Sequence, residues 1–176
     1  MVTEHEKTLQ ALQTAIQMEI DGKEFYLKAS QKSRNEMGKK LLKQLAAEED
    51  IHRQNFEEIY ETMRNKKAWP KTEFQPDGGK GLRTIFAKAT EETGAVAKVL
   101  NTELDAVQTG INMESKTYDF YKAQSKKTAY DAARNFYEAL ASQEREHQLV
   151  LLDYYEYLKD PAGWFVSTEH PSLDGG

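Results

Sequence analysis

Apolar residues recur every three or four positions along four long stretches of the chain, the spacing that gathers them on one face of an α-helix. The seam of the second stretch consists of Leu42, Leu45, Phe56, Ile59 and Met63, and that of the fourth consists of Tyr137, Leu140, Leu151, Tyr154 and Leu158. Shorter seams in the same phase are Leu9, Leu12 and Ile16 in the first stretch and Leu104, Val107 and Ile111 in the third. The pattern predicts an all-α protein with four principal helices.

Capping signals set the expected ends of the first two helices. Thr3 opens a T-x-x-E capping box, so the first helix is expected to begin there and to run to about Ser33. The second is expected to run from about Asn35 to about Asn65. Because only a few residues join them, these helices must lie antiparallel, and residues 3–66 are predicted to form a helical hairpin.

A second helical hairpin is expected over residues 102–160. Thr102 and Thr128, each followed three residues later by an aspartate, are the expected caps of its two helices. Pro161 is expected to stop the last helix, because proline cannot continue the backbone hydrogen-bond ladder. Residues 161–176 are then expected to form an irregular C-terminal tail.

The connection between the hairpins, residues 67–101, is too long for a tight turn. It contains two prolines and three closely spaced glycines, followed by a shorter helical stretch around Leu82 to Ala89. A connection of this length can cross a bundle from one end to the other. We therefore predict a single domain over residues 1–176, a four-helix bundle with a long crossover between its second and third helices.

Six polar residues interrupt the apolar seams at a single level of the predicted bundle. They are Glu19, Glu49, His52, Glu114, Glu144 and His147. Each half of the chain contributes two glutamates and one histidine, and the second set follows the first at a constant offset of 95 residues. The same offset carries the segment IQME onto INME, so the predicted hairpins are related by an internal repeat.

Four carboxylates and two imidazoles are suitable ligands for a pair of octahedral first-row metal ions. Residues three apart on a helix share one face, so each E-x-x-H motif can present its carboxylate and imidazole to the same metal pair. Four buried, unpaired carboxylates would be very unfavourable or would take up protons, whereas two divalent ions would neutralise them. A single such histidine would more often be a core residue satisfied by a neighbouring carboxylate, but the duplicated set favours a metal centre.

Composition excludes several classes of function. Charged residues make up 30% of the 176 residues, and there is neither an apolar run of membrane-spanning length nor a secretory leader, so a cytoplasmic protein without membrane association is expected. The net charge of -5 argues against nucleic-acid binding, which requires a clustered basic surface. The absence of cysteine excludes disulfides, thiolate metal sites and iron–sulfur centres in this polypeptide.

Two tyrosines and one further glutamate lie close to the six residues in sequence. Tyr26 and Tyr121 follow the first glutamate of each half by two helical turns. They are candidates for hydrogen bonds to the ligands or for a transient radical, although core packing is the more frequent role of such aromatic residues. Glu48 is not duplicated, since its counterpart is Gln143, so we expect it at the surface or hydrogen-bonded to a ligand rather than bound to metal.

The segments IQMEIDGKEFY and LAAEEDIH, followed by INMESKTYDFY and LASQEREH, resemble the rubrerythrin-like branch of the ferritin-like di-iron carboxylate proteins over nearly the whole chain. The resemblance implies a ferritin-like four-helix bundle, a centre of two iron or manganese ions, and a homodimer. It implies that Glu49 and Glu144 bridge the two ions and that Glu19 and Glu114 are terminal ligands. His52 and His147 would then bind one ion each.

The chain departs from the family pattern in two respects. Rubrerythrins proper carry a rubredoxin-like domain whose iron is held by four cysteines, and this polypeptide has none, so an external electron donor such as a rubredoxin or a flavoprotein is required. The family also has an extra carboxylate three residues after the ligand of the third helix, and this position is Thr117 here. Because that carboxylate is associated with redox-linked ligand movement, we expect a more symmetric and less specialised site.

Three functions are compatible with these features. The first is a non-haem di-iron oxidoreductase that reduces peroxide or dioxygen with electrons from the external donor, in a role against oxidative stress. The second is iron binding or ferroxidase handling without dedicated peroxidase turnover. The third is a structural bundle whose site is empty or holds zinc.

Overall fold

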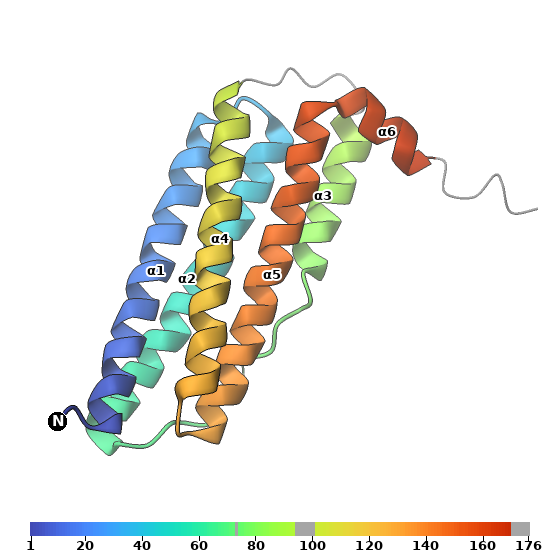
Figure 1. Ribbon diagram of the computed structural model, residues 1–176. Coiled ribbons are helices and arrows are strands. Elements are labelled where there is room, and N and C mark those ends of the chain that lie inside the picture. Colours follow the sequence, from blue (N-terminus) through green and yellow to red (C-terminus); the bar gives the residue numbers. More distant parts are fainter. Residues whose placement is uncertain (73, 94–100, 170–176) are drawn as a thin grey trace, which may run out of the picture.

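The computed structural model describes residues 1–72, 74–93 and 101–169, and all regular secondary structure in these ranges is helical (Figure 1). Its helices are α1 (Glu4–Lys32), α2 (Glu36–Lys66), α3 (Lys80–Thr93), α4 (Asn101–Lys127), α5 (Asp131–Lys159) and α6 (Pro161–Glu169). The long helices α1, α2, α4 and α5 lie side by side as a bundle (Figure 1). The predicted all-α four-helix bundle is therefore confirmed. None of the helices in the described ranges combines the length and apolar character needed to cross a membrane.

The hairpin of α1 and α2 begins and turns as its sequence predicts. The Thr3 hydroxyl accepts a hydrogen bond from the Glu6 amide, and the Glu6 carboxylate accepts one from the Thr3 amide, which completes the capping box. At the turn, the side-chain oxygen of Asn35 accepts from the Met37 amide at 2.9 Å and caps α2. These short-range contacts fix where each helix begins.

The helices of the second hairpin begin at other residues than we predicted. Thr102 does not cap α4, because the helix already includes Asn101. Thr128 does not cap α5 either. Its hydroxyl accepts from the amide of Tyr130, and Tyr130 is the N-cap residue, without a side-chain capping bond. Thr128 thus stabilises the loop between α4 and α5 and does not cap the first turn of α5.

The predicted irregular tail is wrong for residues 161–169, which form α6, while residues 170–176 lie outside the described ranges. Pro161 does end α5, but it also opens α6, because proline is tolerated at the first position of a helix. The Asp160 carboxylate accepts from the Gly163 amide at 3.0 Å and satisfies one of the free amides at the start of α6. The ring of Trp164 then packs edge-on against Phe86 of α3, with 5.6 Å between centroids.

The connection between the hairpins runs the length of the bundle. Figure 1 shows that α2 ends at the end of the bundle where α1 begins, whereas α4 begins at the opposite end. Within this connection, α3 packs against α2 and α5. The predicted crossover is therefore present, and its helix is longer than the stretch expected from Leu82 to Ala89.

The buried core is divided into two apolar clusters. One includes Met37, Leu41, Leu45, Ile111 and Leu151, and the other includes Leu12, Phe56, Ile59, Phe136 and Leu140. Along each long helix, the six polar residues of the repeat lie between the positions that belong to one cluster and those that belong to the other. The fold thus places a polar layer in the middle of the bundle, with apolar packing on both sides.

Candidate metal centre

The structure brings all six predicted residues together inside the bundle. Each of the four long helices contributes at least one of them, and every one is at most 4% exposed. The residues form two overlapping groups whose ligand atoms all lie within 4.8 Å of one another: Glu19, Glu49, His52 and Glu144 in one, and Glu49, Glu114, Glu144 and His147 in the other. Glu49 and Glu144 belong to both groups. The arrangement therefore offers two neighbouring cation positions that share two carboxylates.

Each histidine turns its Nδ1 atom toward carboxylates of both hairpins. His52 Nδ1 lies 3.0 Å from an oxygen of Glu144 and 3.4 Å from one of Glu19. His147 Nδ1 lies 3.0 Å from an oxygen of Glu49 and 3.5 Å from one of Glu114. The imidazole rings are nearly parallel, with centroids 5.7 Å apart. The two halves of the repeat thus form one pseudo-symmetric cluster.

The converging atoms lack hydrogen-bond partners among the described residues. These buried atoms are Glu19 Oε2, Glu49 Oε1, His52 Nδ1, Glu114 Oε2, both carboxylate oxygens of Glu144 and His147 Nδ1. Several of them approach one another closely, but not in the geometry of a hydrogen bond. Buried polar atoms are rarely left without partners in folded proteins. Every one of the six residues supplies such an atom, so the donor set fits a pair of metal ions.

The candidate tyrosines are hydrogen-bonded to this cluster. The Tyr26 hydroxyl in α1 donates to Glu114 Oε1 in α4, and the Tyr121 hydroxyl in α4 donates to Glu19 Oε1 in α1. Burial, followed by the nearby carboxylates, raises the pKa of both phenols well above the ordinary value, so both stay protonated and donate. Glu19 and Glu114 therefore each have one oxygen held by a tyrosine and the other without a hydrogen-bond partner among the described residues.

Without a bound cation, the shifted pKa values favour protonation of several groups in the cluster. Burial and the neighbouring carboxylates raise the pKa of Glu49 and Glu114 well above the usual value. Burial opposes protonation of the two imidazoles, but the surrounding carboxylates outweigh it and raise the pKa of both. Burial alone would also raise the pKa of Glu144, but the charge of His52 holds it well below its usual value. A metal ion that binds here would therefore displace protons from the cluster.

Glu48 is buried and contacts one of the two histidines. One of its oxygens lies 2.8 Å from His147 Nε2 and accepts from the amide of Gln143 at 3.0 Å, and its other oxygen accepts from Gln44. Burial would raise the pKa of Glu48, but His147 and the two amides lower it. The expectation of a hydrogen bond between Glu48 and a ligand therefore agrees with the structure, whereas a surface position does not, since Glu48 is 7% exposed.

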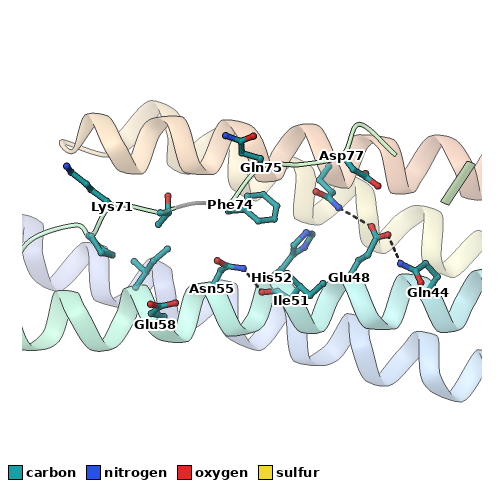
Figure 2. A pocket seen from close by; sticks show the side chains of 14 residues that line it. Gln44, Glu48, Ile51, His52, Asn55, Glu58, Lys71, Phe74, Gln75 and Asp77 are labelled. Atoms are coloured by element: carbon teal, nitrogen blue, oxygen red, sulfur yellow. Dashed lines mark hydrogen bonds between the residues drawn. The ribbon is translucent and has the colours of Figure 1, made fainter. Parts of the chain in front are cut away.

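A pocket of about 820 Å³ reaches the cluster from the side that carries the crossover. Glu48 and His52 of α2 line it, and Phe74 of the crossover lies over the His52 ring (Figure 2). The rings of Phe74 and His52 meet edge-on, with 5.5 Å between centroids. Sequence reasoning did not find this pocket, because residues 67–79 have no helical periodicity that would indicate where they pack.

One glycine beside the cluster was also missed. A Cβ atom on Gly22 would lie 2.8 Å from Glu49 Oε2, closer than van der Waals contact allows. Gly22 therefore leaves the space that the Glu49 carboxylate occupies. The repeat could have indicated this position, because Gly22 corresponds to Thr117 at the offset of 95.

Comparison with known proteins gives a family. The family model described as Rubrerythrin matches residues 10–155, which include all six residues of the cluster. No curated protein and no solved structure matches the chain significantly.

Proposed function

This chain belongs to the rubrerythrin family, and on that premise we propose that it is a non-haem di-iron oxidoreductase that reduces hydrogen peroxide or dioxygen with electrons from an external donor. The single observation that carries the proposal is the set of buried carboxylate and imidazole atoms without hydrogen-bond partners at the middle of the bundle. A buried cluster of this composition is stable when cations neutralise it, and four carboxylates balance two divalent ions.

The geometry supports a definite distribution of ligands. Glu49 and Glu144 belong to both groups of converging atoms, so they are proposed to bridge the two ions. Glu19 and His52 would complete the position on one side, and Glu114 and His147 the position on the other. Iron is the proposed metal because of the family, and manganese or zinc could occupy the same oxygen and nitrogen ligands.

When bound, two ferrous ions supply the two electrons that, with two protons, reduce one peroxide molecule to two waters. The protein residues prepare the site for this chemistry. Tyr26 and Tyr121 fix the terminal carboxylates by holding one oxygen of each. The apolar clusters on both sides close the polar layer toward the two ends of the bundle. The pocket beside His52 gives a small oxidant a route inward.

Electrons must come from another molecule in this proposal. The polypeptide has no cysteine, so within these residues it has no rubredoxin-type centre that could pass electrons to the cluster. The proposed donor is a rubredoxin-like protein or a flavoprotein.

Single-turnover mixing tests the proposal. Anaerobically reduced, iron-loaded protein is mixed with hydrogen peroxide, and oxidation of iron is followed by absorption. We expect oxidation much faster than that of ferrous iron free in buffer, and loss of the fast reaction in a Glu49→Gln or Glu144→Gln variant. Oxidation at the rate of the buffer control would contradict the enzymatic function.

A second candidate function is iron binding or ferroxidase handling without dedicated peroxidase turnover. It is favoured by Thr117, which stands where the family has its extra carboxylate and whose hydroxyl donates to the Met113 carbonyl of its own helix. Multiple turnovers with a reductant separate the two functions, because only a peroxidase continues to consume peroxide. Storage of the ferritin type would also require a closed shell of many subunits, so the mass in solution distinguishes it from the homodimer that we expect.

A further inference from the structure

The two halves of the internal repeat differ in charge at one position beside the proposed metal centre. At the offset of 95, Glu48 corresponds to Gln143 and His147 corresponds to His52. Perfect symmetry would therefore give the Nε2 atom of each histidine a carboxylate from the opposite hairpin. Among the described residues, only Nε2 of His147 has one, at 2.8 Å. The amide nitrogen of Gln143 donates to Glu48 instead.

Glu48 fixes the orientation of His147. Its carboxylate is itself held by the amides of Gln44 and Gln143, at 3.1 Å and 3.0 Å. With Nε2 donating to this anion, Nδ1 of His147 faces into the cluster and is the ring atom available to a metal ion once it has lost its proton. A carboxylate that orients a histidine in this way also makes it a stronger metal ligand. His147 is fully buried and does not line the pocket.

His52 is held less firmly. Its Nε2 atom is buried but has no hydrogen-bond partner in the ranges that the structure describes. The imidazole packs edge-on with the ring of Phe74, and His52 lines the pocket. The imidazole can therefore turn toward the pocket without breaking a hydrogen bond at Nε2. Figure 2 shows the His52 ring between α2 and Phe74, at the wall of the pocket.

The described residues that line the pocket carry a net negative charge, which favours the entry of cations. Among the described residues, three carboxylates line it, those of Glu48, Glu58 and Asp77, together with one ammonium group, that of Lys71. Uncharged amides from Gln44, Asn55, Gln75 and Gln143 provide further oxygen atoms. A negative lining raises the local concentration of divalent ions.

We propose that the two metal positions are unequal: the ion beside His52 is loaded and exchanged through this pocket, whereas the ion beside His147 is retained by Glu48. The inference rests on the proposed metal centre and specifies, in addition, which of its two ions exchanges more readily. It makes Glu48 a positioning residue and the pocket a binding route for a divalent cation.

Chelation of cobalt-loaded protein tests the inference. The full chain is loaded with Co(II), an excess of EDTA is added, and the visible absorption of bound cobalt is followed. We expect two phases of equal amplitude. Glu48→Gln keeps the shape of the side chain but removes its charge, and it should accelerate the slow phase by about 10- to 100-fold, the range typical of mutations in groups that orient metal ligands. The fast phase should stay unchanged.

Two surface variants test the route. Asn55→Trp fills the pocket and should slow both cobalt loading and the fast phase of release, with the slow phase unaffected. Gln10→Trp places the same side chain in a separate surface hollow formed with residues of α4 and should change neither phase. Helix content by circular dichroism, equal to that of the wild type, confirms that each variant is folded.

Crystallography assigns the two positions. With one equivalent of Co(II), anomalous density should lie beside His147, and in the double variant E48Q/Q143E it should move to His52, because the carboxylate has changed sides. Release of both ions in a single phase, or density beside His52 in the wild type, would overturn the inference while leaving the proposed metal centre intact. Failure of the wild type to bind cobalt at all would instead contradict the proposed function.

Discussion

The hydroxyl of Tyr26 in the first hairpin donates a hydrogen bond to the carboxylate of Glu114 in the second, and the repeat reproduces this contact in the opposite direction between Tyr121 and Glu19. Each hairpin therefore holds a proposed ligand of the other. The contacts join the two hairpins at the level where the polar cluster interrupts the apolar packing.

Tyr26→Phe should destabilise the metal-free protein. The substitution leaves a buried oxygen of Glu114 without its donor, and an unsatisfied buried acceptor costs about 1–3 kcal/mol. The free energy of unfolding from urea titration measures the loss. Tyr155→Phe is the matched control, because Tyr155 is only partly buried and has no carboxylate partner in the described ranges. Equal losses in the two variants would show that the contact with Glu114 has no special weight.

Metal removal should lower the melting temperature of the wild type. A ligand that binds only the folded state at a free concentration of 100 Kd stabilises it by about 2.7 kcal/mol. For a domain of this size that corresponds to a shift of about 5–11 °C per bound ion. Thermal unfolding with and without EDTA provides the measurement. The Glu49→Gln variant, which lacks a proposed bridging carboxylate, should show a much smaller difference, and an undiminished shift would contradict the assignment of Glu49.

The polar cluster could be predicted from the sequence because it is encoded twice. Helical periodicity assigns Glu49 and Glu144 to the buried faces of their helices, and the constant offset places both at the same level. The periodicity is a local feature and the offset is a repeat, so both can be recognised in the sequence without knowledge of the tertiary structure. The ends of the first hairpin were predictable for the same reason, since a capping box involves only neighbouring residues.

The parts that depend on tertiary contacts could not be predicted in this way. Thr102 has the sequence signature of a cap, yet α4 extends past it, and the next residue, Glu103, is buried and accepts from the Arg34 amide at the turn of the first hairpin. The pocket beside His52 depends on the path of residues 67–79, which carry no periodic pattern. The different surroundings of the two histidines could not be predicted either, because the sequence alone does not show which histidine Glu48 contacts.

Metal binding should release protons and should weaken as the pH falls. The carboxylates around them raise the pKa of both imidazoles well above the ordinary value, so in the metal-free protein both carry a proton at pH 7. Each must lose it to bind a metal ion, and the raised pKa of Glu49 and Glu114 adds further competition. Lower pH favours the protonated, metal-free cluster, so the apparent metal affinity rises with pH.

Calorimetric titration in buffers of different ionisation enthalpy measures the protons released, and we expect at least two for the pair of ions. A metal affinity that is constant between pH 6 and 8 would contradict the protonation state described here.

Gly22→Ala should separate metal affinity from folding stability. The added Cβ would lie 2.8 Å from Glu49 Oε2, so the carboxylate must move, and in the metal-free protein that movement is cheap because the side chain is flexible. Alanine also favours the helix over glycine by up to about 1 kcal/mol, so the unfolding free energy of the metal-free variant should be unchanged or higher. The displaced carboxylate can no longer bridge, however, and cobalt affinity should fall by at least about tenfold, as for other changes that misplace a ligand.

Thr117→Ala provides the matched control at the equivalent position of the repeat, where a Cβ atom is already present and only a hydroxyl bonded to its own helix is lost. Parallel measurements of cobalt affinity and urea unfolding test the prediction, and a Gly22→Ala variant with the affinity of the wild type would show that Glu49 does not need the space beside α1 to bind metal.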